Sequence, residues 1–88
     1  MMEIRTESGF VCYLQENAAD DMELVDILAG EYPNEAFRNA ALAQHLLGDQ
    51  KKELYEHLRK IHGKVPATAV DKELRDIFRE MGSAGKNS

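Results

Sequence analysis

Residues 44–66 read QHLLGDQKKELYEHLRKIHGKVP, and this stretch decides how the chain folds. Gly48 ends one helical pattern and Asp49 is placed to cap the next, so two helices join with almost no linker. An apolar stripe recurs at i, i+4 and i+7 along the second helix: Leu54, Leu58 and Ile61. Gly63 is the expected C-cap residue, and Pro66 prevents the helix from continuing. The stretch therefore predicts a tight helical hairpin.

The first helix of this hairpin is expected in EAFRNAALAQHLL, residues 35–47, after a start at Pro33-Asn34. Three residues define its main apolar face: Phe37, Ala40 and Leu47. Leu42 and Leu46 point away from that face, so the C-terminal half is apolar on more than one side. Such a helix either lies at the centre of a small bundle or displays a docking patch.

Another helix is predicted before it, through DDMELVDILA at residues 20–29, with a cap at Asn17 and an end at Gly30. At about 100° per residue, one side of this segment gathers six apolar residues: Met22, Leu24, Val25, Leu28, Ala29 and Tyr32. Glu23 and Asp26 fall on the opposite side, in water.

The two ends of the chain complete the predicted fold. Two short β-forming runs around Ser8-Gly9 predict a hairpin with Phe10, Cys12 and Leu14 on one face and Val11 and Tyr13 on the other. One of these faces must pack on helices. A last helix starts at Thr68, with Asp71 completing a capping-box-like pattern, and ends at Gly82. Its narrow apolar face comprises Val70, Leu74, Ile77, Phe78 and Met81.

The sequence thus predicts a mainly α fold of the α+β class, with a short N-terminal β-hairpin followed by a compact bundle of about four helices. A chain of 88 residues has room for one domain, expected over residues 1–82, with residues 83–88 as a flexible tail.

Charge is distributed unevenly. The net charge of -5 and the pI near 5.1 disfavour non-specific binding to nucleic acid or acidic membranes. Residues 15–31 contain six acidic residues and no basic one, whereas residues 49–64 contain five basic residues against three acidic ones. This polarity favours an oriented partner or head-to-tail contact between copies, so a homo-oligomer is one of the expectations.

No constellation in the sequence predicts chemistry. His57 and His62 lie roughly 140° apart around a helix, so their rings do not converge on one ion, and His45 lies on the preceding helix. Glu53 and His57 are i, i+4 neighbours, which is typical of an ordinary helix-surface pair. The single cysteine, Cys12, is expected in the core and fits a reducing compartment. We expect no catalytic residues, no cofactor and no metal site, and hence no enzyme.

Residues 49–62 carry an alternative interpretation. Two helices joined by a tight turn, the second bearing Lys51, Lys52, Arg59 and Lys60, resemble the outline of a helix-turn-helix, which makes a small DNA-binding regulator the rival hypothesis. Glu53 and Glu56 interrupt the basic face, and the Gly48-Asp49 connection is shorter than the turn of that motif. These features and the acidic total favour a protein that does not bind nucleic acid.

Four segments of the sequence resemble those of a known family: RTESGF at 5–10, DDMELVDILAG at 20–30, LLGDQKKELYEHLR at 46–59 and GKVPATAV at 63–70. Together they are similar to the small tail assembly chaperones of long-tailed bacteriophages and prophages of Gram-positive bacteria. The resemblance runs through residues 3–82 and contains no catalytic signature.

The resemblance implies a non-enzymatic role in the cytoplasm of the bacterial host. Such chaperones bind the tape-measure protein, the long helical ruler of the tail, and keep it soluble until tail-tube subunits assemble around it. The tail-tube protein is a second partner that the resemblance suggests, and the chaperone is not expected in the mature virion. The family often has a longer, frameshifted product with the same N-terminal domain.

The residues that contact a partner are our own inference, because the family offers no binding motif to carry over. A chaperone for apolar helical stripes needs apolar surface surrounded by a charged rim. Leu42 and Leu46 are the predicted apolar part, although both also fit a place in the core. Asp21, Glu23 and Asp26 are the predicted rim.

Overall fold

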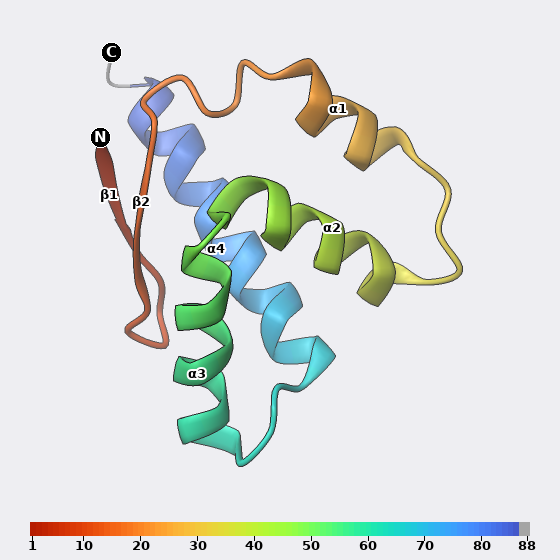
Figure 1. Cartoon of the computed structure of the whole chain (residues 1–88). Coiled ribbons are helices and arrows are strands. Elements are labelled where there is room, and N and C mark those ends of the chain that lie inside the picture. Colours follow the sequence, from red (N-terminus) through yellow and green to blue (C-terminus); the bar gives the residue numbers. More distant parts are fainter. Residues whose placement is uncertain (87–88) are drawn as a thin grey trace.

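The protein is a two-stranded hairpin followed by four helices, as the sequence predicts (Figure 1). The computed structural model describes residues 1–86. The elements are β1 (Met2–Arg5), β2 (Val11–Leu14), α1 (Met22–Ala29), α2 (Glu35–Leu47), α3 (Gln50–His62) and α4 (Ala67–Lys86). In Figure 1 the hairpin lies on one side of the molecule, next to α3 and α4, and α1 lies on the other side beside α2.

The hairpin is antiparallel, with Ile4 opposite Cys12 and Glu3 opposite Tyr13. A three-residue turn closes it: the backbone N–H of Thr6 donates to the carbonyl of Phe10 at 2.9 Å, and that of Gly9 donates to the carbonyl of Thr6 at 3.0 Å. Gly9 has a φ of 95°, which glycine adopts at little cost. The predicted alternation is confirmed: Phe10, Cys12 and Leu14 are buried on the inner face, and Val11 and Tyr13 are partly exposed on the outer face.

The helix ends around residues 30–63 follow the prediction except at Asp49, which directly precedes α3 but whose side chain makes no capping hydrogen bond. The side chain of Asn34 accepts a hydrogen bond from the backbone N–H of Ala36 at 2.9 Å and so caps α2. Gly30, Gly48 and Gly63 end the helices α1, α2 and α3. Gly48 and Gly63 have φ values of 55° and 80°, so the chain can reverse there with little strain.

Helix α1 starts later than predicted, and Asn17 is not its cap. Residues 15–20 form turns in which the backbone N–H of Asp20 donates to the carbonyl of Asn17 at 3.0 Å. Asp21 has the extended backbone of an N-cap, and its carboxylate accepts a hydrogen bond from the backbone N–H of Glu23 at 2.9 Å. The aspartate next to the helix therefore takes the role predicted for the asparagine further away.

Helix α4 differs from the prediction at both ends. It begins at Ala67, so Thr68 lies inside its first turn and not at the cap. It also runs through Gly82 to Lys86, so the predicted stop at Gly82 is wrong. A glycine in a helix costs only about 1 kcal/mol relative to alanine, and Gly82 does not have the positive φ that ends a helix. Of the predicted tail, residues 87–88 lie outside the described residues.

One core joins all six elements. Its most deeply buried side chains come from the hairpin and from α3 and α4: Ile4, Cys12, Leu54, Leu58 and Ile77. The apolar face predicted for α4 is confirmed, with Phe78 only half-buried. Helix α2 is central, because it packs against α1, α3, α4 and β2.

The inward face of α2 is not the predicted one. Leu47 is buried as expected, but Phe37 is 56% exposed and Ala40 is exposed. Leu42 and Ala43 point inward in their place. In a helix that is apolar on several sides, the neighbours decide which side packs, and the sequence alone does not identify them.

Candidate docking surface

The outward face of α1 is apolar and uncovered. Met22, Val25 and Leu28 follow one another at steps of three, and they are 69%, 44% and 48% exposed. We call these three residues the α1 apolar face. On the other side of the helix, buried Leu24 and half-buried Ile27 pack inward. The sequence predicts that Met22, Leu24, Val25 and Leu28 gather on one side of this helix, but only Leu24 of the four is buried, because α1 packs inward on the side of Leu24 and Ile27.

Acidic side chains accompany this face. Glu23 and Asp26, two of the predicted rim residues, are exposed on α1 itself. Asp20 and Glu31, before and after the helix, are exposed as well. Since residues 15–31 contain no basic residue, the α1 apolar face lies in a region of negative charge.

Asp21, the third predicted rim residue, has a structural role. Its carboxylate caps α1 and also lies 2.7 Å from Nε2 of His45 on α2. The hydrogen bond with His45 is the main cause that lowers the pKa of the Asp21 carboxyl, and the backbone N–H of Glu23 adds to it. Asp21 thus starts α1 and attaches this helix to α2.

The predicted apolar pair does not form an exposed patch. Leu42 is only 3% exposed and belongs to the core, and Leu46 is partly buried against it. An open groove of about 450 Å³ runs past Leu46 between the end of β2 and the end of α2, with Tyr13 and His45 among its lining residues. The core interpretation of Leu42 is therefore the correct one, and the exposed apolar residues that follow one another along a single helix are those of α1.

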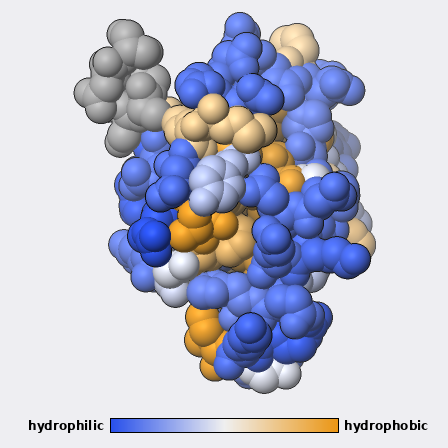
Figure 2. Space-filling view, turned by 60° about the vertical axis from the view of Figure 1, so that its left-hand side comes forward, coloured by the Kyte–Doolittle hydropathy of each residue, from blue (hydrophilic) through white to orange (hydrophobic). Residues whose placement is uncertain are grey.

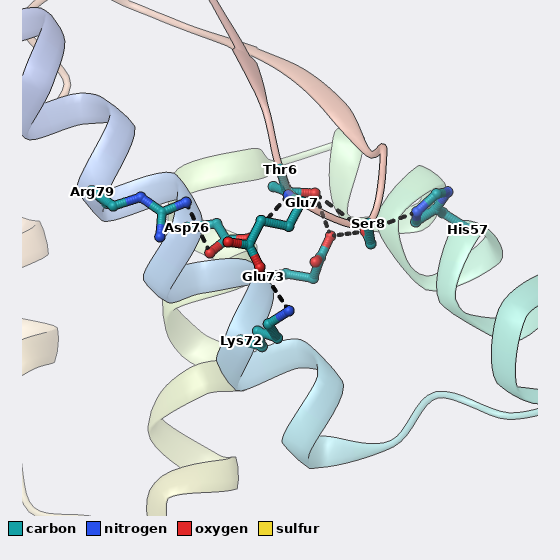
Figure 3. Close-up of polar contacts among 8 residues, drawn as sticks. All are labelled: Thr6, Glu7, Ser8, His57, Lys72, Glu73, Asp76 and Arg79. Carbon is teal, nitrogen blue, oxygen red and sulfur yellow. Dashed lines mark hydrogen bonds and ion pairs between the residues drawn. The ribbon is translucent and has the colours of Figure 1, made fainter.

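A buried polar cluster attaches the hairpin turn to α4 (Figure 3). Glu73 is 2% exposed, and its Oε1 accepts hydrogen bonds from the hydroxyls of Thr6 and Ser8, both at 2.9 Å. Asp76 is 3% exposed and accepts a hydrogen bond from the backbone N–H of Glu7 at 3.0 Å. Buried carboxylates are tolerated where hydrogen bonds satisfy them, and here the turn supplies those bonds.

Two ion pairs lie at the outside of this cluster (Figure 3). The Lys72 ammonium is 2.9 Å from a Glu7 carboxylate oxygen, and the Arg79 guanidinium is 3.2 Å from Asp76. The sequence predicts none of these contacts. The spacing along α4 nevertheless indicates that Glu73 is buried. Glu73 is three residues from Val70 and four from Ile77, so it lies on the same side of the helix as these buried residues.

The cluster contains a serine, a histidine and a glutamate, the composition of a nucleophilic triad. Nε2 of His57 lies 3.0 Å from the Ser8 hydroxyl oxygen (Figure 3). In a triad the carboxylate orients the histidine, whose free nitrogen takes the serine proton. Here the Ser8 hydroxyl donates to Glu73, so the His57 nitrogen that faces it must be the donor. This arrangement fixes the turn and does not prepare Ser8 as a nucleophile.

The three histidines lie in different surroundings. His45 contacts Asp21, and His57 contacts Ser8 and packs near the Phe10 ring at a centroid distance of 5.9 Å. Within residues 1–86, no group of three or more histidine, cysteine or acidic side chains is arranged to hold a metal ion.

The outer surface of α3 alternates in charge. Lys52 and Lys60 are exposed, but so is Glu53, and Arg59 forms an ion pair with Glu56. Phosphate binding needs a continuous basic surface, and this helix offers an interrupted one.

Cys12 lies in the core of the hairpin, as predicted, and is fully buried. Burial is the main cause that raises the pKa of its thiol to about 11, and the nearby Glu73 adds to the shift. The thiol is therefore protonated and inert at neutral pH.

No protein-family model, curated protein or solved structure matches this chain. None of the helices in the described part of the chain combines the length and the apolar character needed to cross a membrane.

Proposed function

We propose that this protein is a non-enzymatic tail assembly chaperone of a long-tailed bacteriophage or prophage, as its sequence resemblance implies. Its partner is the tape-measure protein, which it keeps soluble by covering apolar stripes of that helical ruler. The observation that carries the proposal is the uncovered α1 apolar face, in a protein small enough to need its apolar residues for its own core.

The spacing of this face suits a helical partner. Met22, Val25 and Leu28 form one ridge along α1, and such a ridge packs into the groove between side chains of another amphipathic helix. The exposed Glu23 and Asp26 favour a partner with lysine or arginine beside its apolar stripe. Because no cofactor takes part, binding and release depend only on reversible burial of apolar surface.

Co-expression with a helical tape-measure fragment tests the proposal. We expect the fragment to remain in the soluble fraction and to co-purify with the protein. If the fragment is equally insoluble with and without the protein, the proposal is wrong.

The DNA-binding alternative for residues 49–62 makes a different prediction. A regulator of that kind shifts duplex DNA in a retardation assay, and the shift weakens steeply between low and moderate salt. The chaperone proposal predicts no shift at either salt concentration.

A further inference from the structure

The two edges of the hairpin differ. On the β2 edge, the Gln50 side chain binds the Tyr13 backbone twice: its Oε1 accepts from the N–H at 2.8 Å, and its Nε2 donates to the carbonyl at 2.9 Å. A glutamine of α3 thus occupies this edge in the way that another strand would.

The β1 edge is open. The backbone N–H of Thr6 donates to the carbonyl of Phe10, directly before β2. Backbone N–H and C=O groups alternate in direction along a strand, so those of Ile4, two residues away, also point toward β2. The N–H and C=O groups of Glu3 and Arg5 therefore point away from β2. The structure gives these groups no hydrogen-bond partner within residues 1–86.

We propose that the β1 edge pairs with the β1 edge of a second copy of this chain. The two strands run antiparallel around a twofold axis, with Ile4 opposite Ile4 of the second copy. Glu3 then lies opposite Arg5 of the second copy, and each such pair exchanges two backbone hydrogen bonds. The result is one four-stranded sheet in the order β2, β1, β1, β2.

Charge selects this register. Glu3 and Arg5 are both exposed and lie on the outer face of the hairpin, so opposed side chains become cross-strand neighbours. A register shifted by two residues puts Glu3 opposite Glu3, and the opposite shift puts Arg5 opposite Arg5. Both place like charges together, whereas the proposed register forms two ion pairs.

The neighbouring strands support these ion pairs. Since Glu3 is opposite Tyr13 and Arg5 is opposite Val11 within one copy, each row of the joined sheet reads Tyr13, Glu3, Arg5, Val11 across the two copies. Tyr13 is 48% exposed and Val11 is partly exposed. Figure 2, which turns the hairpin side forward, shows a small hydrophobic area surrounded by hydrophilic residues on this side of the molecule. The apolar neighbours reduce the access of water to the charge pairs.

A charge-swap experiment tests the dimer. Sedimentation equilibrium up to about 1 mM is expected to give twice the monomer mass for the natural protein at the highest concentrations, because a short edge gives a weak interface. Arg5→Glu alone and Glu3→Arg alone each oppose like charges and should remain monomeric. An equimolar mixture of the two variants restores both ion pairs and should again double the mass. Lys60→Glu, a reversal at an exposed position on α3, is the control and should dimerise normally.

Amide hydrogen exchange gives a second readout. The Glu3 and Arg5 amides should exchange fast in dilute protein and slow down as the dimer forms, whereas the inward Ile4 amide should be protected throughout. The proposal is overturned if the natural protein remains monomeric, if either single variant dimerises like the natural protein, or if the mixture does not associate.

Discussion

Replacing Leu28 by serine should weaken partner binding far more than the same change at Ile61. The two residues are isomeric side chains in the last turns of two helices, α1 and α3, and they are 48% and 51% exposed. Figure 1 places these helix ends on different sides of the molecule. The substitutions therefore remove the same chemistry from two places, only one of which belongs to the α1 apolar face.

The exposed fractions set the magnitudes. Full burial of a leucine or isoleucine side chain is worth about 1.5–3 kcal/mol. Each of these side chains is about half buried in the free protein, so folding already gains about half of this burial free energy. Each serine variant should therefore lower the free energy of unfolding by about 1 kcal/mol, which corresponds to about 4–8 °C in Tm. The exposed half of Leu28 is available to a partner, and its loss should weaken binding by about 1 kcal/mol, roughly fivefold in Kd. Adding Val25→Ser should bring the loss to about 2 kcal/mol, roughly thirtyfold.

Isothermal titration with a soluble helical fragment of the partner measures these differences, and thermal unfolding of each variant provides the stability control. The Ile61→Ser protein should bind as the natural protein does while showing the same loss in Tm as Leu28→Ser. Equal Kd values for the Leu28 and Ile61 variants would refute the assignment of the docking surface to α1.

Three further predictions concern stability and reactivity. The Cys12 thiol is buried and its pKa is raised to about 11, so at about pH 8 it should react with a thiol reagent only as fast as the protein unfolds locally or globally. Immediate labelling of the native protein would contradict this. Hydrogen bonds from Arg75 and Asn39 lower the pKa of Asp71, so the ionised carboxylate stabilises the fold at pH values above its ordinary pKa. This contribution is lost as the pH falls below about 4. In urea unfolding between about pH 5 and 3, the free energy of unfolding should therefore fall less for Asp71→Asn than for the natural protein. Ile77→Ala should lower the free energy of unfolding by about 2–5 kcal/mol, since this side chain is fully buried. Lys72→Ala on the same helix removes only an exposed ion pair with Glu7 and should cost much less, so similar denaturant midpoints for the two variants would contradict the core assignment.

The sequence predicts the elements well because local signals determine them. Gly48 and Gly63 need positive φ at helix ends, and Asn34 supplies a cap oxygen next to the first free N–H groups. Alternation between Phe10, Val11 and Cys12 separates the two faces of the hairpin in the same way. Each of these signals acts over a few residues and needs no knowledge of tertiary contacts.

The candidate surface was harder to predict, because it depends on which side of a helix its neighbours cover. The apolar residues of α1 form a surface too wide for one neighbour to cover, and only the packing on α2 decides that Leu24 is buried while Val25 is exposed. Leu42 was ambiguous for the same reason and belongs to the core. The contact between Ser8 and Glu73 joins residues 65 positions apart, and no local pattern connects them.

The two proposed surfaces have a joint consequence for a long partner. A dimer formed through β1 carries two copies of the α1 apolar face, and the hairpin and α1 lie on different sides of each molecule (Figure 1). Once one face has bound a long helical partner, the second face meets the same chain at a high effective concentration, which raises avidity by about 10²–10⁴ over a single site. Arg5→Glu should therefore leave the Kd for a short, single-site fragment unchanged but weaken binding to a long fragment by about 10² or more. Mixing Arg5→Glu with Glu3→Arg protein should restore tight binding to the long fragment. If Arg5→Glu weakens both fragments equally, the hairpin edge belongs to the docking surface itself and the two sites are not separate.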